Sequence, residues 1–421
     1  MKLRYFSALA MLPLIFASCV INNGLDKMTD VQKLLTISMI NSEPYTTAPL
    51  TDPNLPTEIS DFFQYTPNAV LTNFDLLTNE KEYIVISAEI LAQDPIYVVK
   101  TTGNPRNLNK FYGKAPAEDP VSGRHKIIAE LYLTKKTLGF EAPLVVYLPS
   151  LGSKSTILER TIGAYLAKNG FSTLMVYPDM LPSSPDQLMV DLNNFFVRNT
   201  LSIRQTLSLV IDKMNKYFPI ITLHEVIPKL DPNQIYAMGV SLGAIRMPYF
   251  IASEPRVKKG AIIMGGGGLP DLLTESEETS VIAYRNYQYK NNRFVPGKEA
   301  FRAVIKQFWF MDPLELVSYI HPNRISQAIT IGDNVVPTSL QYMLHGNIGK
   351  NLPSPIGTSD LKTYNFNYYG KPLLSGVVEA YELTNGGHPP PEGHFDLATQ
   401  LKDVLNFVRD GINRKRVDPN S

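Results

Sequence analysis

The chain has very little cysteine, no excess of either charge and no internal repeat. A single cysteine, Cys19, occurs among 421 residues, so no disulfide can form within one chain and stability must come from a packed core. The 40 basic residues are matched by 39 acidic ones, without the basic stripe that a nucleic-acid-binding surface needs. No cluster of histidine, cysteine and aspartate has metal-ligand spacing. We therefore expect no metal, no cofactor and no nucleic-acid partner.

The N-terminal residues have the layout of a secretory signal. Two basic residues precede the apolar run 5–16, which is too short to cross a bilayer as a permanent helix, and small residues follow it. The segment Phe16–Cys19 resembles the bacterial lipoprotein signal. The resemblance implies that residues 1–18 are a signal peptide and that Cys19 becomes the acylated first residue.

Such an anchor implies a cell-envelope protein attached to a membrane. Val20, where an aspartate would signal retention at the inner membrane, resembles the outer-membrane sorting pattern. The alternative is a soluble secreted protein that is cut near Ser18 and keeps Cys19 as an incidental thiol.

The rest of the chain divides by pattern. Residues 19–79 are proline-rich and predict a tether with an N-terminal embellishment. Residues 80–412 alternate strand-like and helical runs, which predicts an α/β domain with a mostly parallel twisted sheet flanked by helices. Inside it, an aromatic-rich helical insertion at 270–323 predicts a cap, and 338–375 predicts a polar loop excursion. Residues 413–421 form a polar tail.

Individual elements are predicted from the spacing of apolar residues. Strands are expected at 83–90, 127–133, 143–148, 171–176, 234–238, 260–264, 328–331 and 377–383, and helices at 158–166, 201–216, 242–252 and 395–409. The strand–helix–strand unit over 143–176 predicts parallel pairing.

The segment Gly239–Gly243 reads Gly-x-Ser-x-Gly and lies between a predicted strand and a predicted helix. In that setting Ser241 occupies a strained turn that lifts its hydroxyl out of the sheet. The flanking glycines are needed because a side chain at either position would collide with a neighbouring element.

Two further features follow later in the chain. Asp333 comes directly after the strand 328–331, and two histidines, His388 and His394, precede the last predicted helix. Together with the serine turn, these residues resemble the α/β-hydrolase family, and within it the secreted esterases and dienelactone-hydrolase-like members. The resemblance covers roughly residues 80–412 and implies the α/β-hydrolase fold.

The family order of nucleophile, acid and histidine implies a Ser241–Asp333–His394 triad. His388 is the alternative base, and Asp312 is the runner-up acid, although it is more easily read as the cap of a helix that begins at Pro313. The four remaining histidines are expected to be surface or turn residues: His125, His224, His321 and His345.

The resemblance also implies an oxyanion hole. The Leu242 amide would be one donor, and Leu151, with Gly152 as a fallback, would supply the other from the loop after strand 143–148. The run Gly265–Gly268 is interpreted as a tight turn near the cleft, because a phosphate-binding lysine does not follow it. Eight aromatic residues of the cap either line an acyl pocket or pack cap helices: Tyr284, Tyr287, Tyr289, Phe294, Phe301, Phe308, Trp309 and Phe310.

These residues imply a serine hydrolase that cleaves a small or lipid-like carboxylic ester through an acyl-enzyme. Two alternatives remain open. The same triad would support acyl transfer to an alcohol if water were excluded. A lipoprotein that kept the fold could instead bind ligands or partners without turnover.

Overall fold

A computed structural model of the chain describes residues 28–46, 51–101, 112–116, 123–136, 141–150, 157–177, 189–292, 295–353, 360–365 and 409. The strands are β1 (Val70–Asn79), β2 (Tyr83–Gln93), β3 (Tyr97–Thr101), β4 (Tyr112–Pro116), β5 (Arg124–Thr134), β6 (Glu141–Leu148), β7 (Ser172–Tyr177), β8 (Lys229–Val240), β9 (Val257–Ile263), β10 (Ile325–Ile331) and β11 (Asp360–Asn365). The helices are α2 (Asp30–Ser42), α3 (Thr57–Ser60), α4 (Ile157–Lys168), α5 (Met189–Asp212), α6 (Phe218–Ile221), α7 (Leu242–Ser253), α8 (Leu269–Glu275), α9 (Thr279–Asn291), α10 (Lys298–Phe308), α11 (Pro313–Ser318) and α12 (Thr338–Gly346), with short 3₁₀ turns at Asp61–Phe63, Met214–Lys216 and Pro322–Arg324.

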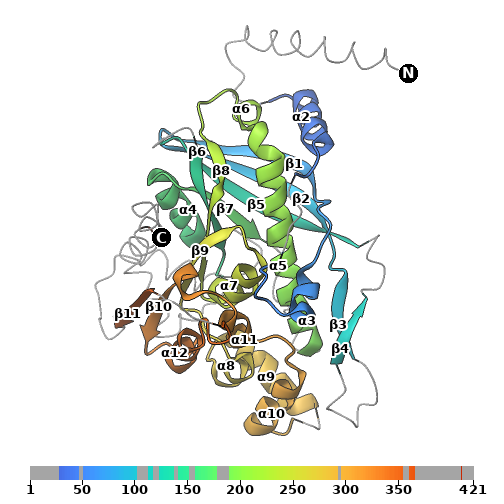
Figure 1. Cartoon of the computed structure of the whole chain (residues 1–421), viewed down its shortest axis with the longest axis vertical. Helices are drawn as coiled ribbons and strands as arrows, with labels where there is room; N and C mark the ends of the chain where they lie inside the picture. Colours follow the sequence, from blue (N-terminus) through green and yellow to red (C-terminus); the bar gives the residue numbers. More distant parts are fainter. Residues whose placement is uncertain are drawn as a thin grey trace.

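Nine of these strands form one twisted sheet in the order β1-β2-β5-β7-β6-β8-β9-β10-β11 (Figure 1). The pairs from β1 to β7 are antiparallel, and those from β7 to β11 are parallel. The strands β3 and β4 form a separate hairpin. Helices cover both faces of the large sheet, which confirms the predicted fold class.

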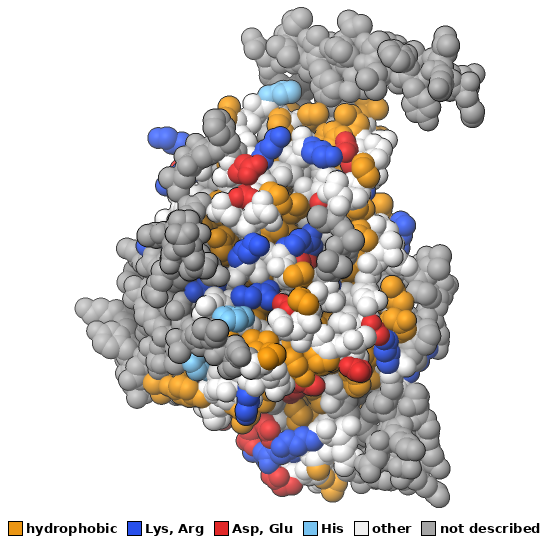
Figure 2. Space-filling view, in the orientation of Figure 1, with side chains coloured by type: hydrophobic (Ala, Val, Ile, Leu, Met, Phe, Trp, Pro, Cys, Tyr) orange, Lys and Arg blue, Asp and Glu red, His pale blue; other side chains and the backbone are white. Residues whose placement is uncertain are grey.

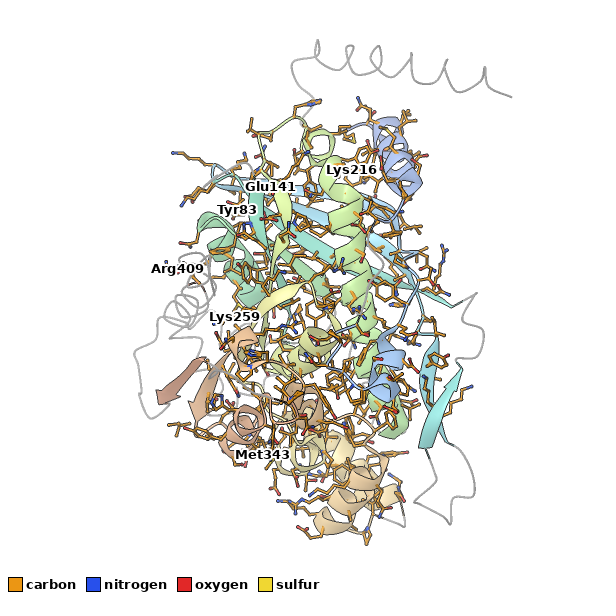
Figure 3. The ribbon with its side chains drawn as sticks, in the orientation of Figure 1. Tyr83, Glu141, Lys216, Lys259, Met343 and Arg409 are labelled. Carbon is orange, nitrogen blue, oxygen red and sulfur yellow. The ribbon has the colours of Figure 1, made fainter. Side chains whose placement is uncertain are left out.

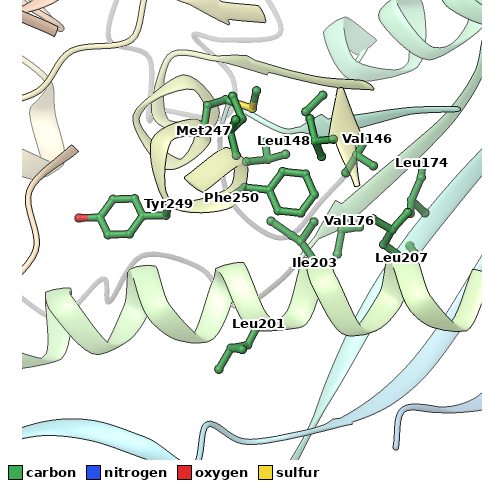
Figure 4. Packing of buried hydrophobic residues seen from close by; sticks show 14 of the residues in the cluster. Val146, Leu148, Leu174, Val176, Leu201, Ile203, Leu207, Met247, Tyr249 and Phe250 are labelled. Carbon is green, nitrogen blue, oxygen red and sulfur yellow. The ribbon is translucent and has the colours of Figure 1, made fainter. Parts of the chain in front are cut away.

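The two layers of helices follow from the alternation of side chains along each strand. On β6, Val146 and Leu148 face the layer formed by α5 and α7 (Figure 4). Their neighbours Val145 and Tyr147 face the opposite side, where α4 packs. Because both faces are covered, β6 reads as one continuous apolar run, as the sequence predicted.

Helix α5 begins earlier than the predicted start at residue 201. Its first half is rich in asparagine and threonine, which have modest helix propensity because their side chains compete for backbone groups. Two of these side chains bond to the helix backbone instead, whereas Asn193 and Asn194 bond to the backbone of Phe310 and Val99 outside it. The amide of Asn199 donates to the Phe195 carbonyl at 2.8 Å, and the Thr200 hydroxyl donates to the Phe196 carbonyl at 2.8 Å.

Both ends of the sheet also differ from expectation. Strand β1 joins the sheet although it lies in the segment 19–79 that was predicted to be a tether and embellishment. Strand β11 and helix α12 lie inside 338–375, where a loop excursion was expected. Strand β11 reads Asp-Leu-Lys-Thr-Tyr-Asn, without the apolar run that reveals a buried strand, so the sequence pattern did not predict it. The strand expected at 377–383 lies outside the described residues.

The insertion at 270–323 is helical, as predicted, and its described part holds α9, α10, α11 and most of α8. Five of its aromatic side chains pack against other rings. The ring of Phe301 meets those of Tyr284 and Tyr289 edge-on, and Phe310 packs against Phe62. The Trp309 ring packs edge-on against Phe196 of α5. These contacts show the packing role that the sequence analysis left open.

A buried ion cluster ties α5 to the end of α7. The carboxylate of Glu254 lies 3.3 Å from Nε of Arg204 and 2.7 Å from Nη2 of Arg256. Arg204 also donates to the Phe63 carbonyl at 2.6 Å, so it connects the N-terminal segment as well. Burial alone would raise the pKa of Glu254, but the hydrogen bonds from Arg256 and the two positive charges hold it below its usual value.

On the face shown in Figure 2, basic and acidic side chains are interspersed rather than segregated by sign. Within the described ranges, none of the helices has the length and apolarity needed to span a membrane.

We expect Glu254→Gln to destabilise the protein by about 3 kcal/mol, because it leaves the guanidinium of Arg204 buried without a negative partner. Since the folded-state pKa of Glu254 is lowered, its stabilisation is present at neutral pH and disappears as the pH falls below about 4. The free energies of unfolding of the wild type and of Glu254→Gln, measured with urea, should therefore become equal in acid. Glu82→Gln, which removes an exposed ion pair with Lys136, is the control and should change stability by less than about 1 kcal/mol. Equal effects of the two substitutions would contradict this account.

Candidate active site

Ser241 occupies a strained turn between β8 and α7. Its backbone angles are φ 53° and ψ −119°, a conformation that few non-glycine residues adopt. The turn is fixed on both sides, because the Ser241 amide donates to the Ile263 carbonyl at 2.9 Å and its carbonyl accepts from Ile245 at 3.0 Å. Ser241 is 8% exposed. This is the geometry predicted for the Gly-x-Ser-x-Gly segment.

The two glycines of the turn are required by close packing. A Cβ on Gly243 would lie 2.0 Å from the carbonyl oxygen of Leu148, and one on Gly239 would lie 2.5 Å from the carbonyl oxygen of Gly243. Helix α7 therefore starts in direct contact with the carboxyl end of β6. Any side chain at either position would push the serine turn away from the sheet.

The start of α7 supplies a hydrogen-bond donor next to Ser241. The Leu242 amide belongs to the first turn, whose N–H groups have no acceptor within the helix and carry the positive end of its dipole. On the facing loop, the Ser150 amide donates to Glu159 at 3.3 Å and its hydroxyl donates to the same oxygen at 2.8 Å. The Ser150 amide is therefore already used in a hydrogen bond to Glu159. The expected residue, Leu151, lies outside the described residues, as does Gly152.

Arg246 links the serine turn to that loop, and the sequence analysis missed it. Its guanidinium donates to the Pro149 carbonyl at 2.5 Å and to the Leu242 carbonyl at 3.4 Å. Burial lowers the pKa of Arg246 to about 10, with the nearby Tyr147 acting in the opposite direction. An arginine within the otherwise apolar helix Leu242–Ser253 is the signal that could have drawn attention to it.

Strand register brings Ser241 and Asp333 to the same edge of the sheet. Val240 of β8 is level with Ile263 of β9, which is level with Ala328 of β10. All three strands are parallel, so their carboxyl ends meet at one edge. Because neighbouring strands are about 4.8 Å apart, the ends of β8 and β10 are about 10 Å apart. A side chain that joined Ser241 to Asp333 would have to bridge the end of β9.

The carboxylate of Asp333 is buried and held by four donors. The Thr330 hydroxyl and the Gln341 amide donate to Oδ2 at 3.0 and 3.1 Å, and the Val335 and Val336 amides donate to Oδ1 at 2.9 and 3.0 Å. The two backbone bonds are those of a turn aspartate. The two side-chain bonds, from β10 and α12, fix the orientation of the group beyond what the turn requires.

The runner-up acid has a structural role instead. Asp312 accepts from the Leu314 amide at 2.8 Å, as expected of the residue that caps α11. It also accepts from the Gly268 and Leu269 amides at 2.8 and 2.7 Å, so both its oxygens are occupied by helix starts. The preceding glycine run forms a packed turn, since a Cβ on Gly266 would lie 2.8 Å from Val336. Its interpretation as a structural turn is supported.

The candidate bases and the lipid-anchor cysteine lie outside the described residues: His388, His394 and Cys19. The triad that includes His394 therefore remains a prediction from the sequence. Within the part of the chain that the structure describes, no group of histidine, cysteine and carboxylate side chains is placed to hold a metal ion.

A different serine, histidine and aspartate do lie in a row, on the opposite part of the sheet. His125 Nδ1 lies 3.0 Å from Asp94 Oδ1, and its Nε2 lies 2.6 Å from Ser202 Oγ. The hydrogen bond with His125 holds the pKa of Asp94 below its usual value, and the charge on Arg198 adds to this effect. The expectation that His125 is a surface or turn residue was therefore wrong, because it lies on β5 inside this network.

That row does not have the features of an active site. Ser202 is completely buried in the middle of α5, on regular helix rather than on a strained turn. Its hydroxyl lies 2.8 Å from the Arg198 carbonyl, one helical turn earlier. The network thus joins α5 to the ends of β2 and β5.

The strand order, the parallel half of the sheet and the strained serine between β8 and α7 define an α/β-hydrolase fold. No family model matches the chain, and no curated protein sequence matches it.

Solved structures do resemble it in outline. Acetyl xylan esterase 1 from a Thermoanaerobacterium species matches at 15% identity and TM-score 0.47, over 88% of this chain and 98% of its own. An acetyl xylan esterase from a Paenibacillus species matches at 13% identity and TM-score 0.45, over 85% and 99% of the two chains. Likeness at this level does not establish an activity, which has to be argued from the site.

We expect Gly243→Ala to destabilise the protein by at least about 2 kcal/mol, because its methyl group would overlap the Leu148 carbonyl. Gly346→Ala is the matched control, since nothing lies within 4 Å of a Cβ placed there. In the control, alanine should leave stability unchanged or raise it by up to about 1 kcal/mol. Urea unfolding measures the stability of both variants. A Gly243→Ala protein as stable as the control would show that the close contact between Gly243 and the Leu148 carbonyl is not required.

Proposed function

We propose that this protein is a carboxylic-ester hydrolase in which Ser241 is the nucleophile. The observation that carries the proposal is the strained backbone of Ser241 at the start of α7. Strain of this kind persists only where the surrounding structure enforces it, and here two glycine contacts and two backbone hydrogen bonds do so. It presents a hydroxyl beside the N-terminus of a helix, where a developing negative charge is stabilised.

In the proposed reaction, the hydroxyl of Ser241 attacks the ester carbonyl while His394 accepts its proton. The Leu242 and Leu151 amides donate to the resulting oxyanion. His394 then gives the proton to the leaving alcohol, and an acyl-enzyme remains. Water, activated by the same histidine, attacks the acyl-enzyme and releases the acid.

Asp333 would hold His394 in the tautomer that accepts the proton from Ser241 and would stabilise the imidazolium. Its support comes from the four donors that fix the carboxylate at the end of β10. We further propose that Cys19 is the acylated first residue of the mature protein, which places the enzyme at a membrane of the cell envelope.

Ser241→Ala is expected to lower kcat for a simple aryl ester by about a million-fold, because no other group can form the acyl-enzyme. The measurement is hydrolysis together with labelling by a fluorophosphonate, located by peptide mass spectrometry. Ser202→Ala is the matched control and should keep both activity and labelling at Ser241. A folded wild-type protein that forms no adduct at Ser241 would favour a binding protein without turnover.

The identity of the base can be tested by comparing His394→Ala with His388→Ala. We expect the first to lose activity by at least about 10⁴-fold and the second to lose less than about tenfold. Asp333→Asn should lower kcat by about 10⁴-fold, since an amide would favour the wrong tautomer of the histidine. The pattern reversed between the two histidines would assign the role to His388 and leave the rest of the mechanism standing.

A further inference from the structure

One end of the molecule carries most of the exposed large apolar side chains among the described residues. They lie on α2, near the end of β1 and on the loop after α6, and we call this group the apolar end: Val31, Leu34, Leu35, Leu77, Leu223 and Val226. Val226 is 84% exposed, and Val31 and Leu34 are 66% exposed each. Figure 1 places α2 and α6 together at the upper end of the molecule, and Figure 2 shows hydrophobic side chains gathered there.

Helix α2 is held in place by one face and shows a second apolar face to solvent. Its inner face buries Ile40, and the side chain of Asn41 forms two hydrogen bonds with the backbone of Leu71, at 2.8 and 2.9 Å. Val31, Leu34 and Leu35 have the i, i+3, i+4 spacing of a single helix face. The inner face already secures the helix. Contacts within the described part of the chain therefore do not explain why three apolar residues occupy its outer face.

The loop after α6 is equally fixed. Leu223 and His224 both have positive φ, at 55° and 67°. Glu225 accepts from the Asn79 amide at 3.0 Å and pairs with Lys135 at 3.1 Å, so the loop is joined to the end of β1. This backbone holds Leu223 and Val226 outward although water surrounds them.

The charges at this end are largely paired with one another. Lys33 pairs with Asp75 at 2.7 Å, and Lys216 pairs with Glu43 at 2.6 Å. A partner that covers the apolar end would therefore be held by burial of apolar area rather than by attraction between opposite charges.

The apolar end and Ser241 are at opposite ends of one strand. Val226 precedes the start of β8, and Ser241 follows its last residue. Strand β8 runs beside the eight residues of β6, with extra residues bulged out between Leu230 and Ile235, so it is about 25 Å long at about 3.3 Å per residue. In Figure 3, Lys216 near α2 and Met343 of α12 lie in opposite halves of the molecule.

We propose that the apolar end rests on the lipid bilayer, so that Ser241 opens away from it toward the aqueous side. We choose a bilayer as the partner because the segment that follows Cys19 leads directly into α2, at the apolar end. Met28 packs on the core just before α2, and the eight residues between it and Cys19 let the two Cα atoms lie at most about 32 Å apart. An acylated Cys19 would therefore keep the apolar end close to the membrane surface.

This orientation deepens the proposed function, on which it rests, by specifying the substrate class. An active site about 25 Å from the bilayer cannot reach acyl esters embedded in it. The substrate is an ester on a water-soluble molecule or polymer that reaches the site from the aqueous side.

The experiment uses the full-length acylated protein in vesicles of phosphatidylethanolamine and phosphatidylglycerol. Acylated Cys19 does not react with thiol dyes, so one introduced cysteine, Val226→Cys or Met343→Cys, gives a unique label. We expect quenchers carried on the lipid chains to reduce the emission of the dye at 226 by at least about twofold and to leave the dye at 343 unchanged. Equal quenching at both positions, or quenching at 343 alone, would overturn the proposal.

A triple variant, Val31→Glu, Leu34→Glu and Leu35→Glu, should abolish the quenching at 226 while the protein stays anchored, and raising the salt concentration should not. Activity on a soluble ester should be unchanged by this variant, and esters dissolved in the same vesicles should not be hydrolysed. Faster hydrolysis of the vesicle ester than of the soluble one would overturn the substrate class.

The outcomes separate this inference from the proposals on which it rests. Mass spectrometry reports acylation of Cys19 by itself, and the dye positions report orientation even in a protein without activity. Sedimentation of Cys19→Ser protein tests the other occupant. A dimer that the triple variant abolishes would assign the apolar end to a second copy of the chain.

Discussion

The structure depends on how closely the start of α7 approaches the sheet. Gly243 meets the Leu148 carbonyl of β6, and Gly239 meets the backbone of Gly243. With no side chain between them, the helix begins directly on the strand ends and Ser241 is forced into positive φ. The Leu242 amide then lies next to the serine, and Arg246 bridges back to the Pro149 carbonyl. One steric condition therefore positions the serine, a helix N-terminus and the facing loop together.

Most of the fold and half of the candidate site could be predicted from the sequence, because they depend on local patterns. Buried parallel strands read as apolar runs, and the serine turn is recognised from the glycines on either side of Ser241. What was missed depends on partners distant in sequence. Strand β11 has no apolar run and is recognised only by its pairing with β10, and Arg246 is informative only once the Pro149 carbonyl is placed against it. His125 likewise gains its meaning from residues on β2 and α5.

The His125 network shows why three side chains in a row do not make a nucleophile. Its distances of 2.6 and 3.0 Å are those of a relay, and the aspartate is ionised. Yet Ser202 is enclosed in α5, where neither a substrate nor a helix N-terminus can face its hydroxyl. Ser241 differs in its backbone conformation, which turns the hydroxyl out of the sheet and beside the N–H groups of the first turn of α7. The chemistry of a serine is thus set by the turn that carries it more than by its neighbours.

The direction of the parallel strands determines where the candidate active site and the apolar end lie. All catalytic candidates with known position follow the carboxyl ends of β8 and β10, because the loops there converge. The segments that precede the strands, including the loop before β8, must then gather at the other end, which is where α2 also packs. In the proposed orientation the anchor segment leads directly into α2, so that end of the molecule lies nearest the membrane. In that proposed orientation the length of the strands separates the anchor from the active site, and the ester would reach Ser241 from the aqueous side.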